Sequence, residues 1–227
     1  MRMKGDYKFI RGIFKEYKFS YSDLFNETKN VENETTIWSD SYLEFYPYQN
    51  ALNQLTKPKI YKTEPESKES VIVNKLKDDE VYYSYRAENE GWGSVFIINK
   101  DHAKICLMFF NNDDDEIVLG QVYYIIYKSE FIIDKVLFYS MDEDIDGDKE
   151  FDEQTFMIDE YLYNENDTID SITRNGFYET KKNVLAERKF RFEYSDNKFF
   201  IYSKQLKKNN SDIEELSYVL KKESTKQ

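Results

Sequence analysis

The chain has 227 residues, of which 40% are hydrophobic and 17% aromatic, and its formal net charge is −12. This apolar content excludes a disordered chain and is enough for a hydrophobic core. The 20 tyrosines and 17 phenylalanines, set against seven glycines and three prolines, favour β-sheet over a helix bundle. The single cysteine, Cys106, excludes an internal disulfide framework.

The cellular location is predicted from the apolar runs of the sequence. The first ten residues carry charges, but no apolar run of signal-peptide length follows them. No later segment is long and apolar enough to be read as a membrane span. We therefore expect a cytoplasmic protein with no membrane span.

Residues 1–56 predict an N-terminal helical and aromatic segment that docks on the rest of the chain. Between Tyr7 and Phe25, apolar residues recur with a helical period and basic residues lie between them. Such a basic amphipathic stretch can lie on an anionic membrane, but packing its apolar face on the protein's own core is the commoner arrangement. Residues 57–70 contain two of the three prolines and predict a linker.

Residues 71–227 predict an antiparallel β domain that ends in a helix. Short apolar runs follow one another between turns rich in Asn and Asp, and in Phe190, Phe192 and Tyr194 the apolar residues alternate with charged ones. This pattern indicates a β meander that closes into a barrel or folds into two packed sheets. The runs are 71–76, 81–88, 93–100, 103–110, 117–127, 131–141, 154–163, 168–178, 187–195 and 198–204.

The last part of the chain predicts a capped helix over residues 212–222. Ser211 and Glu214 form a capping box, and Ile213, Leu216 and Leu220 then lie on one helical stripe. The expected fold class is therefore α+β, a predominantly antiparallel meander with an N-terminal helical segment and a C-terminal capped helix.

The segment 142–153, DEDIDGDKEFDE, has the spacing of calcium ligands. Its acidic residues and Gly147 fall at positions one, three, five, six and twelve of a twelve-residue loop, so the segment resembles the calcium loop of the EF-hand family. The resemblance implies the metal ligands Asp142, Asp144, Asp146, Asp148, Glu150 and Glu153.

Two features of this segment argue against a regulatory EF-hand. Lys149 stands where the family has an aliphatic residue, and residues 132–141 read as well for a strand as for a helix. If both flanks are strands, the same acids form a long hairpin loop that is either a solvated acidic loop or a calcium site. The expected cofactor is therefore none, or Ca²⁺.

Catalytic chemistry finds little support in the sequence. The only histidine, His102, precedes Cys106 by four residues, but Cys106 lies in an apolar run and reads as a core thiol. Gly91-Trp92-Gly93 is too short for a phosphate-binding fingerprint. We therefore expect a protein that is not an enzyme.

The negative charge is concentrated in one stretch. Residues 113–160 contain sixteen Asp and Glu against three Lys, a net charge of −13, so the rest of the chain sums to +1. A local negative field argues against nucleic acid and favours a basic protein partner, although a solvated acidic face kept for solubility gives the same pattern. The predicted contact residues are Asp113, Asp114, Asp115, Glu116, Asp142, Asp144 and Asp146, with Trp92, Tyr123 and Tyr124 as aromatic anchors.

In this general character the chain resembles the small acidic immunity proteins that bacteria encode beside polymorphic toxins. The resemblance implies a non-catalytic inhibitor of antitoxin type that masks a basic toxin or nuclease through an acidic surface. The alternative is a calcium-binding regulatory or calcium-stabilised binding domain that uses the loop at 142–153.

Overall fold

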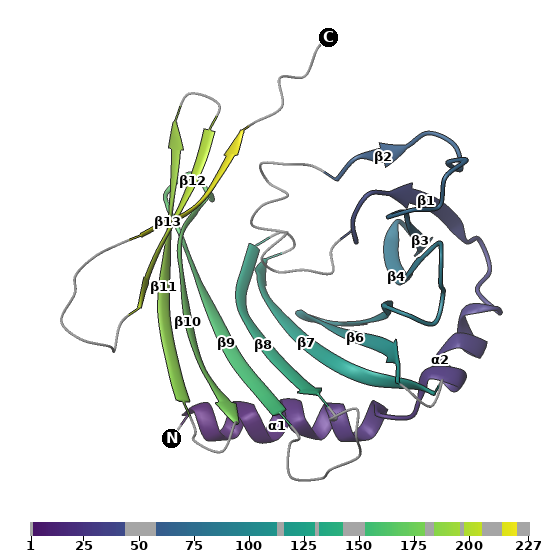
Figure 1. The fold of residues 1–227 in the computed structure, drawn as a ribbon, viewed down its shortest axis with the longest axis horizontal. Coiled ribbons are helices and arrows are strands. Elements are labelled where there is room, and N and C mark those ends of the chain that lie inside the picture. The colour runs from purple at the N-terminus through teal and green to yellow at the C-terminus, as the bar shows by residue number, and fades with distance from the viewer. Residues whose placement is uncertain are drawn as a thin grey trace.

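A computed structural model shows two helices and one antiparallel sheet of thirteen strands (Figure 1). It describes residues 2–43, 58–112, 116–129, 132–142, 153–179, 184–195, 198–205 and 215–221. The helices are α1 (Arg2–Tyr17) and α2 (Tyr21–Thr28). The strands are β1 (Thr35–Ser39), β2 (Ile60–Tyr61), β3 (Ile72–Lys77), β4 (Glu80–Arg86), β5 (Ser94–Lys100), β6 (Ala103–Asn111), β7 (Ile117–Ser129), β8 (Ile132–Asp142), β9 (Glu153–Tyr163), β10 (Ile169–Glu179), β11 (Val184–Ser195), β12 (Lys198–Gln205) and β13 (Glu215–Lys221).

The strands from β3 to β13 form a meander in chain order, and β1 and β2 extend it beyond β3. Each of the ten predicted apolar runs overlaps a strand of this meander, so the prediction of an antiparallel β architecture is confirmed. The expectation of a barrel or of two packed sheets is wrong. The sheet is single and open, with β2 and β13 as its edges, and Figure 1 shows it curving without closing.

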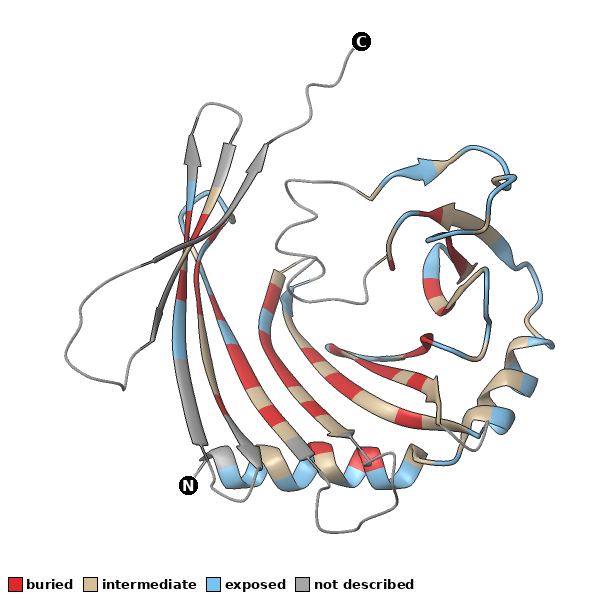
Figure 2. Ribbon diagram, viewed as in Figure 1, coloured by how far each residue is buried: buried red, intermediate tan, exposed pale blue. Residues whose placement is uncertain are grey.

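Helix α1 lies across one face of the sheet. Its apolar residues Ile10, Ile13 and Phe14 are buried and pack against β7 and β8, which agrees with the expectation that this face covers the protein's own core. Figure 2 shows buried residues on the side of α1 toward the sheet and exposed residues along its outer side. The helix ends at Tyr17, and the Lys18 carbonyl accepts a hydrogen bond of 3.1 Å from the Leu119 N–H, which ties this end of the helix to β7.

The central strands contribute core residues to both faces of the sheet. Along β6, Leu107 and Phe109 belong to the cluster beneath α1, whereas Cys106, which precedes Leu107, belongs to the cluster on the opposite face, and all three are fully buried. The alternation of side chains along a strand produces this division. The prediction that Cys106 is a core thiol is confirmed.

The predicted helix at 212–222 is wrong, because residues 215–221 form strand β13, paired with β12. Leu216 and Leu220 have helical spacing, but together with Tyr218 they also recur at every second residue, which is the period of a strand. Pairing with β12 satisfies the backbone of one more strand, and this tertiary gain outweighs the local capping signal. Neither helix described in the structure is long and apolar enough to cross a membrane.

Candidate functional site

The topology brings three predicted contact regions to the same end of the sheet. Successive antiparallel strands reverse direction, so the β4–β5, β6–β7 and β8–β9 connections leave the sheet at one end. We call this the Trp92 end, and define it by residues 87–93, by Asn112 and Glu116, and by Asp142 and Glu153. The β6–β7 and β8–β9 connections are separated by two strand spacings, about 10 Å.

Trp92 is an exposed aromatic residue that its neighbours hold in place. Its side chain is 40% exposed, and the guanidinium carbon of Arg86 lies 4.3 Å from the ring centroid. The ring of Phe110 approaches edge-on, with centroids 6.2 Å apart. A cation–π contact of this kind contributes about 0.5–1 kcal/mol at an exposed site. The indole therefore has a defined orientation while part of it remains open to solvent.

The glycines on either side of Trp92 allow close approach of the surrounding side chains. A Cβ on Gly91 would lie 2.8 Å from Ile117 Cδ1 and 2.9 Å from Asn111 Oδ1. Gly93 has a φ of +75°, which is unfavourable for residues with a side chain, and a Cβ there would lie 2.9 Å from the Tyr42 hydroxyl. The Gly-Trp-Gly sequence thus fits a loop that is packed closely against Ile117 and Asn111 on one side and against Tyr42 on the other.

Tyr42 provides the clamp on the Gly93 side. Its hydroxyl donates a hydrogen bond of 2.5 Å to the Gly93 carbonyl, and its side chain is buried. Burial raises the pKa of Tyr42, although a hydrogen bond with Arg86 acts in the opposite direction. The hydroxyl therefore stays protonated near neutral pH and remains a donor to the Trp92 loop.

The β6–β7 turn begins and ends with reciprocal hydrogen bonds. The Asn112 N–H donates to the Glu116 carbonyl, and the Glu116 N–H donates to Asn112 Oδ1, both at 2.8 Å. An asparagine side chain that accepts a backbone N–H in this way is typical of tight turns. Glu116 is exposed, whereas Asp113, Asp114 and Asp115 lie outside the described residues.

The flanks of the predicted calcium loop are strands. Asp142 ends β8, Glu153 begins β9, and the two residues are paired across the ladder. The helix-loop-helix surroundings of an EF-hand are therefore not formed. Asp144, Asp146, Asp148 and Glu150 lie outside the described residues. Among the residues that are described, no group of three or more His, Cys, Asp or Glu side chains is placed to hold a metal ion.

The two predicted tyrosine anchors are not at the Trp92 end. Tyr123 is 6% exposed and packs in the core, with its ring centroid 4.7 Å from that of Phe138. Tyr124, its neighbour on β7, points to the other face and packs edge-on against Phe9 at 4.9 Å. Adjacent strand residues face opposite sides of a sheet, so one tyrosine faces the core and the other faces α1. Tyr123 is thus a core residue and not an accessible anchor.

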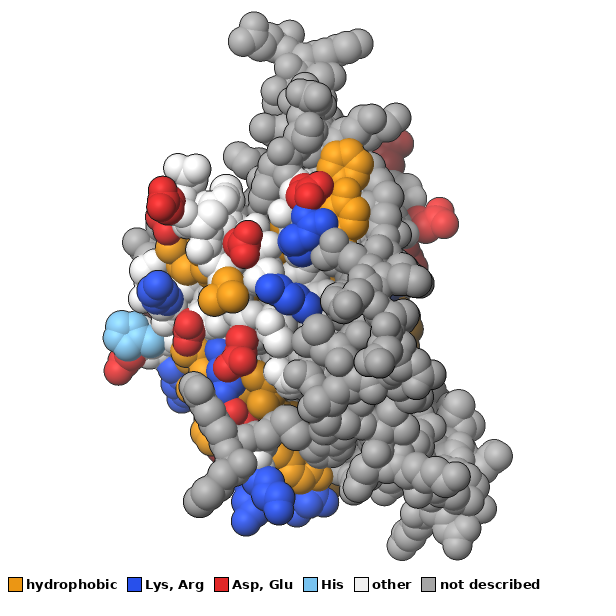
Figure 3. Space-filling model, turned by 90° about the vertical axis from the view of Figure 1, so that its left-hand side faces the viewer, with side chains coloured by type: hydrophobic (Ala, Val, Ile, Leu, Met, Phe, Trp, Pro, Cys, Tyr) orange, Lys and Arg blue, Asp and Glu red, His pale blue; other side chains and the backbone are white. Residues whose placement is uncertain are grey.

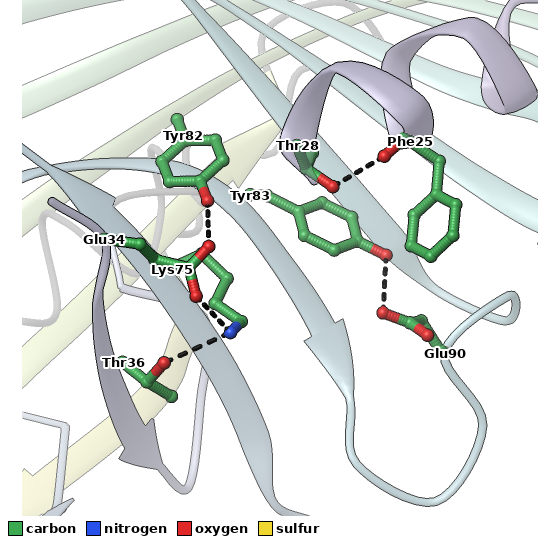
Figure 4. Close-up of polar contacts among 8 residues, drawn as sticks. All are labelled: Phe25, Thr28, Glu34, Thr36, Lys75, Tyr82, Tyr83 and Glu90. Atoms are coloured by element: carbon green, nitrogen blue, oxygen red, sulfur yellow. Dashed lines mark hydrogen bonds and ion pairs between the residues drawn. The ribbon is translucent and has the colours of Figure 1, made fainter. Parts of the chain in front are cut away.

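The described carboxylates away from the Trp92 end include several that are committed to internal contacts. Glu34 accepts hydrogen bonds from Lys75 and Tyr82, and Lys75 also donates to Thr36 at 3.2 Å (Figure 4). Burial would raise the pKa of Glu34, but the hydrogen bonds from Lys75 and Tyr82 hold it below its ordinary value. This network joins the start of β1 to β3 and β4, and it gives Glu34 a structural task.

A second committed carboxylate is Asp159, which is 6% exposed. Arg174 donates to both of its oxygens, from Nε and from Nη2, at 2.7 Å each. Such a bidentate pair fixes the register of β9 and β10.

Cys106 and His102 are placed apart in the structure. Cys106 lies within β6 and is fully buried, whereas His102 lies in the β5–β6 turn at the opposite end from Trp92.

Sequence reasoning identified Trp92 but missed Tyr42, Arg86 and Phe110, which hold it. Tyr42 is fifty residues from Trp92 in the chain, so no local pattern connects them. The signal that was present is the pair of glycines around one aromatic residue, which marks backbone positions where a side chain does not fit. No protein-family model, no curated protein and no solved structure matches this chain.

Proposed function

We propose that the protein is a non-catalytic, cytoplasmic binding protein whose Trp92 end binds a basic protein. In its concrete form, it is an inhibitor of immunity or antitoxin type that masks a basic toxin or nuclease. The observation that supports this most is the position of Trp92. It is exposed and held in place at the end of the sheet to which the acidic β6–β7 and β8–β9 connections belong.

The two components of this surface have different physical roles. A Trp that is already oriented loses little side-chain freedom on binding, and Trp is among the residues that dominate interface energies. Acidic residues contribute by steering a basic partner and by fixing its orientation. The net charge of −13 over residues 113–160 supplies the field for that steering.

The test is coexpression with the basic protein encoded by the neighbouring reading frame, followed by purification and titration calorimetry. We expect one complex in which the other protein's toxicity is suppressed, with an affinity that falls as salt increases from low to physiological concentration. An affinity that is indifferent to salt would contradict an acidic masking surface.

A matched pair of charge reversals locates the surface. Glu116→Lys changes the Trp92 end, whereas Glu165→Lys makes the same charge change in the exposed β9–β10 turn at the opposite end. We expect Glu116→Lys to weaken the complex by about tenfold and Glu165→Lys by less than about threefold. Equal effects of the two variants would mean that only the net charge matters.

A calcium-stabilised binding domain is the second candidate, because Asp142 and Glu153, the first and last predicted ligands, are paired across the ladder of β8 and β9. Under this alternative, about 1 mM Ca²⁺ raises the melting temperature, the same concentration of Mg²⁺ does not, and Glu153→Gln abolishes the difference. If Ca²⁺ and Mg²⁺ have the same effect, the calcium alternative is wrong.

A further inference from the structure

The outer face of α1 carries a line of four basic residues, Lys4, Lys8, Arg11 and Lys15. Their spacing of four, three and four residues places them on one side of the helix, and they line a hollow of about 490 Å³. We call this line the basic stripe. Figure 3 shows Lys and Arg side chains gathered at the lower end of the molecule, at the level of α1 in Figure 1.

Most of the basic stripe opposes the stability of its own helix, since only Lys15, in the last turn, is placed favourably for the helix dipole. The first turn of α1 contains no acidic residue, and Lys4 there faces the positive end of the helix dipole. Each successive pair along the stripe consists of like charges three or four residues apart, an arrangement that destabilises a helix. Among the described residues, none of the four forms an ion pair; Arg11 instead lies 5.8 Å from the ring centroid of Tyr7.

Two glycines in the interior of α1 add to this cost. Gly5 and Gly12 are seven residues apart and lie beside the stripe, and Gly12 lines the same hollow. A Cβ at either position would meet no atom within 4 Å, so packing against the described residues does not explain them. Glycine within a helix is less stable than alanine. Because these two glycines have no side chain, the helix backbone along one flank of the stripe is accessible to a binding partner.

The packing of α1 does not require the stripe, because the buried side of the helix already attaches it to β7 and β8 through Ile10, Ile13 and Phe14. An exposed face with Lys4 against the dipole, like-charged neighbours and open glycines is explained if the face binds a negatively charged partner. We propose that the basic stripe is a docking site for an acidic polypeptide segment of a partner protein.

The side chains on this face favour an acidic polypeptide over other polyanions. Binding of single-stranded nucleic acid requires exposed aromatic rings beside the cations, and the ring of Tyr7 is packed against Tyr139 and Phe156. Membrane binding requires exposed apolar residues beside the cations, and the one exposed phenylalanine of α1, Phe9, lies away from the stripe, beyond the flank with Gly5 and Gly12, against Tyr124.

The dimensions of the stripe suit an extended acidic segment. From Lys4 to Lys15 the stripe spans about 16 Å of helix. Carboxylates at alternate residues of an extended chain lie about 6.6 Å apart, close to the spacing of about 4.5–6 Å between successive cations along the axis. The open backbone at Gly5 and Gly12 leaves room for the segment to approach the helix closely. This site is independent of the proposed function, since it has the opposite charge and lies on a different element.

The test measures binding of a fluorescent twelve-residue peptide of alternating Glu and Gly to the full chain by anisotropy. The variant is Lys4→Glu with Lys8→Glu, and its matched control is Lys77→Glu with Lys100→Glu, two exposed lysines on the sheet with the same total charge change. We expect the stripe variant to bind the peptide at least about tenfold more weakly and the control less than about threefold more weakly.

Thermal unfolding completes the test, because the stripe variant replaces Lys4 by an anion at the positive end of the helix dipole and is expected to melt no earlier than the wild type. Equal losses of peptide binding in the two variants would contradict the proposal. The proposal would also be overturned if the wild type did not bind the peptide. This holds whether or not the same lysines bind anionic vesicles or single-stranded DNA.

Discussion

The Trp92 end and the basic stripe are both exposed, but they relate to the rest of the molecule in opposite ways. At the Trp92 end, the orientation of one exposed indole depends on its contacts with Arg86 and Phe110 and on the hydrogen bond between Tyr42 and Gly93. On the outer face of α1, the exposed residues make few internal contacts and work against the helix. Changes at the Trp92 end should therefore alter binding and stability together, whereas changes on the stripe should separate them.

Replacing a glycine by alanine should change the free energy of unfolding in opposite directions in the two regions. It should lower the free energy of unfolding at Gly93, where the larger effect is expected, and raise it at Gly12. Gly93→Ala introduces a Cβ at positive φ and against the Tyr42 hydroxyl, so we expect a loss of about 2 kcal/mol in the free energy of unfolding. Urea denaturation measures this directly. A loss below about 0.5 kcal/mol would mean that the loop around Trp92 is not clamped.

The Glu34 network gives a reference region, where a carboxylate acts on stability alone. Glu34→Gln should lower the free energy of unfolding at pH 7 by about 1 kcal/mol, because Lys75 loses its charged acceptor. Since the pKa of Glu34 is lowered in the folded state, this contribution is complete above its ordinary pKa of 4.5 and is lost as the pH falls through the folded value.

The measurement is the free energy of unfolding of the wild type and Glu34→Gln at a series of pH values. The two curves should converge below the folded pKa of Glu34. A difference that stays constant from neutral pH into the acid range would show that the ionised carboxylate is not responsible.

Gly12→Ala should give the smallest effect and a gain. Alanine is more stable than glycine in a helix interior by about 0.5–1 kcal/mol, and the new methyl group meets no atom within 4 Å. Urea denaturation should show this gain, while the acidic peptide should bind more weakly because its approach is hindered. A loss of stability would show that the flank of the helix is not open.

Local patterns of apolar residues predicted much of the fold, and they failed where the spacing of apolar residues fits both a helix and a strand. Alternation in runs such as 187–195 and 198–204 identified strands, because one side of each strand must be buried whatever its neighbours. In 215–221 the leucines fit both a helix and a strand, and pairing with β12 decided between them. Such a tertiary contact is not visible in a sequence window.

The site was predictable in part for a similar reason. In the sequence, Trp92 is recognisable by the glycines on either side of it, and the acidic residues are recognisable because they are concentrated in residues 113–160. Tyr123 and Tyr124 look equivalent in the sequence, yet one lies in the core and the other beneath Phe9, because burial depends on which strands and helices cover each face. The four cations of the basic stripe are regularly spaced, but only the folded structure shows that they make no ion pair with the described residues.

The central claim is that Trp92 anchors a basic partner, and titration calorimetry of two truncation variants tests it most directly. Trp92→Ala removes the anchor, and Leu162→Ala removes an exposed apolar side chain near the opposite end of the sheet. The account predicts that Trp92→Ala weakens the complex with the basic partner by at least about thirtyfold, corresponding to about 2 kcal/mol, while Leu162→Ala leaves it within about threefold. Equal affinities of Trp92→Ala and the wild type would contradict it.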